Sequence, residues 1–133
     1  MIIMREDIRY FILQEINEIR RKHGKKPISL HLEESHNSKK HAEHLMETLP
    51  DISVLSQKHH APGHCLNSWS ENQGAKEFRG SVYLAVSKII ENFAKDPAHL
   101  NNMLNAKSHV ATDISFRNLA NGKKKIFLCT RHK

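Results

Sequence analysis

Four titratable side chains in two segments of this chain could together form one chemical site. The first segment carries His60 and, eleven residues later, Glu71, and the second carries Asp96 and, three residues later, His99. Neutral imidazoles are common zinc ligands, and carboxylates either bind such an ion or orient the imidazoles that do. The sequence therefore predicts a divalent-cation site, with zinc the expected ion. His60 and His99 would be its ligands and Glu71 and Asp96 its acidic members.

Each of these residues also has an alternative structural role. His60 and His99 could serve only as hydrogen-bonding groups in a polar cleft. Glu71 could accept backbone N–H groups in a tight turn. Asp96 stands directly before Pro97, which is the sequence signature of a helix N-cap. The sequence alone leaves both sets of roles open.

Neighbouring residues are further candidates for the same cleft. His59 and His64 flank His60 and could replace it as a ligand if the loop that carries them is placed differently. Trp69 and Asn72 lie on either side of the glutamate and could form part of the cleft wall. An indole at that position would present a large apolar surface with one N–H donor.

Catalysis has weaker support in the sequence than binding. Cys65 lies next to His64, but a catalytic thiol also needs a lowered pKa, for which the sequence offers no evidence. The HExxH helix motif of metallohydrolases is absent. His41 and His44 have helical spacing, but no third ligand accompanies them, and we expect both at the surface. We therefore expect a binding protein rather than an enzyme, with a hydrolase that uses the same cleft as the alternative.

The elements that would position these residues follow from the pattern of apolar side chains. Helical periodicity predicts helices over residues 5–23, 32–49 and 82–93, and the Asp96-Pro97 cap predicts a short fourth helix. Residues 51–80 show no regular period and are predicted as a loop-rich segment. Alternation predicts strands at residues 110–116 and 126–130, joined near Asn121-Gly122. Helices followed by an antiparallel hairpin indicate a single α+β domain over residues 1–133.

Four short segments occur in a characteristic order: residues 16–24, His41-Ala42 with Met46, Ser70-Glu71-Asn72, and residues 97–104. In this order and at this spacing they resemble the CAP superfamily, which comprises cysteine-rich secretory, antigen 5 and pathogenesis-related 1 proteins and is also called the SCP domain family. The last segment resembles the bacterial type. The resemblance runs from about residue 5 to the end of the chain.

The resemblance implies a three-layer α-β-α sandwich with a small antiparallel sheet and a central cleft. Two histidines and two acids line that cleft in the family, and they correspond here to His60, His99, Glu71 and Asp96. Several members bind zinc or another divalent cation there, and members also associate with lipids, so a lipid-like or peptide ligand is expected beside the cation. This chain departs from the family pattern in Ser70 for glycine, in Asp96 for glutamate and in lacking the usual disulfides.

The overall charge bears on possible partners. The formal net charge is +7, and the lysines and arginines are spread along the chain rather than gathered in one block. Such a balance permits binding to an anionic membrane surface. Nucleic-acid binding is disfavoured, because no module of nucleic-acid recognition is present. The resemblance implies secretion, although residues 1–4 are too short for the apolar core of a signal peptide.

Overall fold

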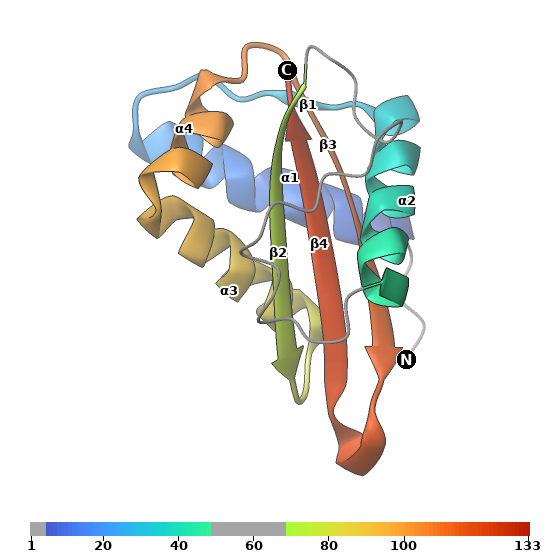
Figure 1. Cartoon of the computed structure of the whole chain (residues 1–133). Coiled ribbons are helices and arrows are strands. Elements are labelled where there is room, and N and C mark those ends of the chain that lie inside the picture. The colour runs from blue at the N-terminus through green and yellow to red at the C-terminus, as the bar shows by residue number, and fades with distance from the viewer. Residues whose placement is uncertain (1–4, 49–68) are drawn as a thin grey trace.

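The computed structural model describes residues 5–48 and 69–133 (Figure 1). Four α-helices, four strands and one 3₁₀ turn occur in these residues. In chain order they are α1 (Arg5–Lys22), β1 (Ser29–Leu30), α2 (Leu32–Thr48), β2 (Ser70–Phe78), α3 (Val82–Lys95), α4 (Pro97–Asn105), β3 (His109–Asn118), η2 (Ala120–Gly122) and β4 (Lys124–His132). The predicted helices are confirmed to within about two residues at their described ends.

The four strands form one sheet in the order β1-β3-β4-β2. β4 pairs antiparallel with β3 on one side and with β2 on the other, whereas β1 pairs parallel with β3. The sheet is therefore mixed, because two residues of β1 add a short parallel edge to the predicted antiparallel arrangement. The predicted hairpin is confirmed: Asn121 and Gly122 both adopt positive φ angles, 62° and 75°, in the connection between β3 and β4.

Helices cover both faces of this sheet, which confirms the predicted three-layer α-β-α architecture (Figure 1). Because successive side chains of a strand point to opposite faces, β4 contributes to two cores. Ile126 and Leu128 pack with residues of α1 and α3, whereas Phe127 and Cys129 pack with the inner face of α2. Among the described residues, no helix combines the length and the apolar character that a bilayer span requires.

One prediction is wrong in part: residues 70–78 belong to a nine-residue strand, β2, rather than to a loop. The strand carries Glu71, Asn72, Gln73 and Gly74 in its first half, so its sequence lacks the apolar alternation by which strands are recognised. Pairing with β4 along its whole length supplies the order that its own residue types do not indicate. Residues 51–68 of the predicted loop lie outside the described residues, and residues 69, 79 and 80 belong to no helix or strand.

Candidate ligand cleft

A pocket of about 240 Å³ lies between β2, α3 and the start of α4. Its floor is largely apolar and its rim polar, and it is lined by Gly74, Ala75, Ile89, Asn92, Phe93, Asp96 and His99. Gly74 is required for the close approach of β2 to α3, because a Cβ at this position would lie 2.2 Å from Ile89 Cγ2. Asp96 and His99, two of the four predicted site residues, both line this pocket.

Asp96 forms the junction between α3 and α4. Its backbone N–H bonds to the carbonyl of Phe93 at the end of α3. Its carboxylate accepts the backbone N–H of His99 at 3.1 Å and so caps the N-terminus of α4, with Pro97 in the first turn. The predicted N-cap is therefore confirmed. This cap determines where the His99 side chain emerges.

The Asp96 carboxylate also contacts the imidazole of His99. Asp96 Oδ2 lies 2.5 Å from His99 Nδ1, and the imidazole stacks on the Phe93 ring with centroids 5.0 Å apart. The backbone N–H of His99, followed by its ring, lowers the pKa of Asp96. When Nδ1 donates to this carboxylate, Nε2 of the neutral ring holds the free lone pair. Stacking and hydrogen bonding together fix the ring orientation, while both side chains remain about half exposed.

Asn72 connects β2 to α4 from the buried side. Its Nδ2 donates to the carbonyl of His99 at 3.0 Å, and its Oδ1 accepts from Asn102 Nδ2 at 2.9 Å. The side chain is fully buried, so these bonds replace those it would make with water. Asn72 was predicted as a cleft candidate, and in the structure it holds the helix that carries His99.

Glu71 lies on the other face of the sheet, toward α2. Its carboxylate accepts from Arg131 Nε at 2.7 Å and from Gln73 Nε2 at 3.1 Å, and His41 Nε2 lies 3.4 Å from Oε1. The side chain is only 5% exposed. The structure therefore does not place Glu71 beside the Asp96–His99 pair, but in a separate buried polar network.

Arg131 is the centre of this network, and no sequence pattern indicated its role. Its guanidinium bridges two carboxylates, because Nη1 also lies 2.7 Å from Glu34 Oε2. The three side chains join α2, β4 and β2, and Arg131 is 0% exposed. We refer to Glu34, Arg131 and Glu71 as the buried charge network.

His41 belongs beside this network, and its predicted surface position is wrong. The side chain is fully buried, whereas His44 on the same helix is exposed. The signal was present in the sequence: His41 precedes Leu45 by four residues, which places it on the apolar face of α2. The nearby Cys129 thiol donates to Glu71 Oε2 at 3.4 Å, and burial raises the pKa of this thiol well above its usual range.

Other predicted residues fall elsewhere. His59, His60, His64 and Cys65 lie outside the described residues. Trp69 is buried directly before β2, where its ring packs edge-on against His31. In the two described ranges, no group of three or more histidine, cysteine, aspartate or glutamate side chains is arranged to hold a metal ion. The predicted pairing of His60 with His99 stays a prediction.

Comparison with known proteins identifies the class of this fold. A model of the Cysteine-rich secretory protein family, CAP, matches residues 13–111. The chain therefore belongs to the CAP family, as its sequence motifs predicted. No curated protein matches the sequence at a significant level.

Solved structures show the same fold at low sequence identity. The Ancylostoma-secreted protein Ac-ASP-7 superposes with a TM-score of 0.52 at 14% identity, over 95% of this chain and 68% of its own. Manganese-bound Ac-ASP-7 superposes with a TM-score of 0.53 at 13% identity, over 98% and 71%. An outer surface protein from Borrelia burgdorferi superposes with a TM-score of 0.52 at 9% identity, over 98% and 96%. These likenesses show the fold alone.

Proposed function

We propose that this CAP-family chain binds a divalent cation at the candidate ligand cleft, with His99 as a ligand. The Asp96–His99 hydrogen bond carries the proposal. Imidazoles that bind metal ions commonly donate their other ring nitrogen to a carboxylate, which fixes the tautomer and raises the basicity of the ligating nitrogen. Asp96 and His99 have this relationship at 2.5 Å, and the pair is accessible to solvent.

The residues present fit an open, exchangeable site better than a closed structural one. A structural zinc site uses four protein ligands. The described part of the cleft offers an imidazole and one supporting carboxylate, and Glu71 is engaged by Arg131 on the other face. His60 remains the predicted second ligand. A bound cation would supply positive charge for an anionic or carbonyl-bearing ligand. The structural neighbour manganese-bound Ac-ASP-7 supports a divalent cation of some kind.

The floor of the cleft suggests what would bind beside the cation. Ile89 and Phe93 present hydrocarbon surface next to the polar rim. Such a combination of apolar floor and few polar groups suits a lipid-like or peptide ligand. Cys129 does not suit nucleophilic catalysis, because it is fully buried with a raised thiol pKa. A nucleophilic cysteine needs exposure and a lowered pKa.

Calorimetric titration of Zn²⁺ and Mn²⁺ into the full chain tests the proposal. We expect the wild type to bind at least one of these ions and His99→Ala to lose it. Asp96→Asn should bind about 10- to 100-fold more weakly, the usual effect of losing a carboxylate that supports a ligand. The matched control is His36→Ala, which removes an exposed imidazole from α2. Identical isotherms for wild type and His99→Ala would contradict the proposal.

His60→Ala in the same titration tests whether His60 is the second ligand of the ion. Loss of binding in this variant would support the predicted pair of His60 and His99. Retained binding would mean that His99 works with other donors.

A further inference from the structure

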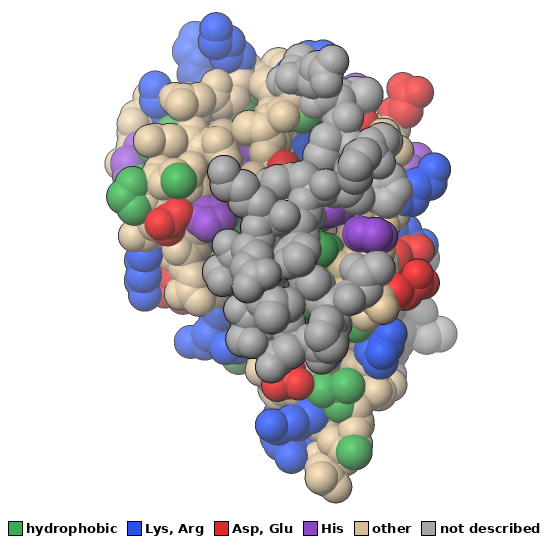
Figure 2. Space-filling model, viewed as in Figure 1, with side chains coloured by type: hydrophobic (Ala, Val, Ile, Leu, Met, Phe, Trp, Pro, Cys, Tyr) green, Lys and Arg blue, Asp and Glu red, His purple; other side chains and the backbone are tan. Residues whose placement is uncertain are grey.

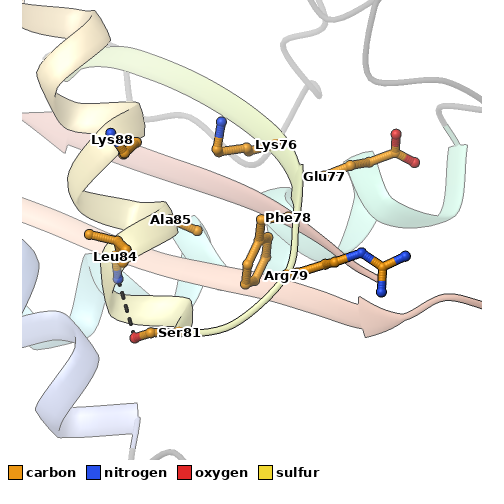
Figure 3. A pocket seen from close by; sticks show the side chains of 8 residues that line it. All are labelled: Lys76, Glu77, Phe78, Arg79, Ser81, Leu84, Ala85 and Lys88. Carbon is orange, nitrogen blue, oxygen red and sulfur yellow. Dashed lines mark hydrogen bonds between the residues drawn. The ribbon is translucent and has the colours of Figure 1, made fainter. Parts of the chain in front are cut away.

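A second pocket, of about 270 Å³, lies between the end of β2 and the first two turns of α3 (Figure 3). Phe78, Leu84 and Ala85 supply its apolar surface, and Lys76 and Lys88 contribute one cation from each wall. This volume is slightly below the range usual for complete small-molecule ligands, about 300–1,000 Å³. It suits the polar head of a larger molecule.

The side chains that line this pocket point in two directions. On β2, Lys76 and Phe78 lie on the side that faces α3, whereas Glu77, and Arg79 directly after the strand, point away from it (Figure 3). This alternation follows from the two-residue period of a strand. The acid among the lining residues is therefore directed away from the two lysines. The result is a positively charged pocket with a hydrocarbon floor.

The β3–β4 hairpin extends this basic surface. The Arg79 guanidinium donates to the carbonyl of Asn121, and Lys124 Nζ donates to the carbonyl of Gly80 at 3.0 Å. The tip of the hairpin and the turn after β2 are thus joined. The tip itself carries Lys123.

Large apolar side chains are exposed near the same basic surface. Leu84 is 61% exposed on α3, and Phe116 is 42% exposed on β3, near the hairpin. Figure 2 shows lysine and arginine side chains beside apolar and acidic ones at the lower end of the molecule, where the hairpin projects in Figure 1. Exposed hydrocarbon within a basic surface is the composition that binds acidic membranes, through charge at the head groups and apolar contact beneath them.

We propose that this end of the molecule binds the surface of an anionic bilayer. The amines of Lys76 and Lys88 would contact the head group of an acidic phospholipid, and Leu84 would contact its glycerol and upper acyl carbons. Within the pocket a membrane is favoured over a nucleic acid, because the exposed apolar side chain there is the aliphatic Leu84, whereas base stacking uses accessible aromatic faces. The Phe78 ring is buried, with Lys124 Nζ 6.0 Å from its centroid. The proposal is independent of cation binding at the candidate ligand cleft.

Sedimentation with phospholipid vesicles tests this proposal in the full chain. The vesicles are phosphatidylcholine alone or phosphatidylcholine mixed with phosphatidylserine. The test variant is Lys76→Gln/Lys88→Gln, and Leu84→Ser probes the apolar contact. The matched control, Lys25→Gln/Lys26→Gln, removes the same charge from the exposed loop between α1 and β1, at the other end of the sheet (Figure 1). Circular dichroism checks that each variant is folded.

We expect the wild type to bind only the vesicles that contain phosphatidylserine. Each lysine near such a surface contributes about 1 kcal/mol, so losing both should weaken partitioning by about 30-fold. Leu84→Ser should also weaken it, and the control pair should change it by less than about threefold, because charges remote from the bilayer are screened. Equal weakening by the two lysine pairs would show diffuse attraction and overturn the proposal.

Two further outcomes would also overturn it. One is the absence of wild-type binding to the acidic vesicles. The other is full competition by soluble glycerophosphoserine, which would show that the pocket takes a free anion rather than a membrane.

Discussion

The pairs Asp96–His99 and Glu71–Arg131 both join a carboxylate to a nitrogen base, yet they lie in opposite environments. The first pair is about half exposed at a helix junction, and the second is buried between α2 and the sheet. An exposed pair can exchange its partner for a ligand at little cost. A buried charge that loses its partner is left without solvation, which costs several kcal/mol. Burial therefore gives Glu71–Arg131 a structural role, whereas exposure leaves Asp96–His99 accessible for the proposed cation binding.

The largest effect is expected from breaking the buried charge network. Arg131→Met leaves Glu34 and Glu71 buried without their shared cation, and we expect it to lower the free energy of unfolding by about 3–5 kcal/mol. Urea denaturation measures this change. The triple variant Glu34→Gln/Arg131→Met/Glu71→Gln should recover part of the loss, because it removes the unpaired charges. A loss below about 1 kcal/mol in Arg131→Met would mean that the network does not contribute to stability.

A second expected effect is loss of stability in acid through His132. This ring contacts Ser70 Oγ and Thr130 Oγ1, and burial lowers its pKa from 6.5 to about 3. Because the folded-state pKa is the lower one, the unfolded chain binds the proton first. The stabilisation is present above pH 6.5 and is lost as the pH falls toward 3, by up to about 1.4 kcal/mol for each pH unit.

Denaturation at several pH values measures this loss, and His132→Gln is the matched variant. It lacks the titrating group, so its stability should fall less steeply between about pH 6 and pH 4, a range within the span of the two pKa values. Equal slopes for the two proteins would assign the acid sensitivity to other groups.

The smallest effect on stability is expected from the exposed pair. Asp96→Ala removes the cap of α4 and the partner of His99, so it should lower the melting temperature by less than Arg131→Met does. Asp96→Ser isolates the second role, because serine can still cap the helix but cannot supply a carboxylate. Thermal melts together with metal titration distinguish the two roles. If Asp96→Ser restores both stability and metal affinity, Asp96 acts only as a cap.

The local structure of the chain could be predicted from its sequence. Apolar residues recur at helical spacing in α1 and α3 and alternate with polar ones in β3 and β4. Because each pattern extends over many residues, it outweighs the propensity of any single residue. The helices and the hairpin could therefore be predicted. The cap at Asp96 was predictable because it depends only on the residues that immediately follow it. The placement of His99 one turn later comes directly from that cap.

The face of the sheet toward which each polar side chain points could not be predicted from its neighbours in the sequence. Glu71 and Asn72 are adjacent in the sequence, yet one faces α2 and the other α4, because β2 is a strand. Arg131 acquires two carboxylate partners only because α2 and β2, distant in sequence, place one on each side of it. Such contacts depend on which elements pack together, and the desolvation that makes them strong exists only after they have packed.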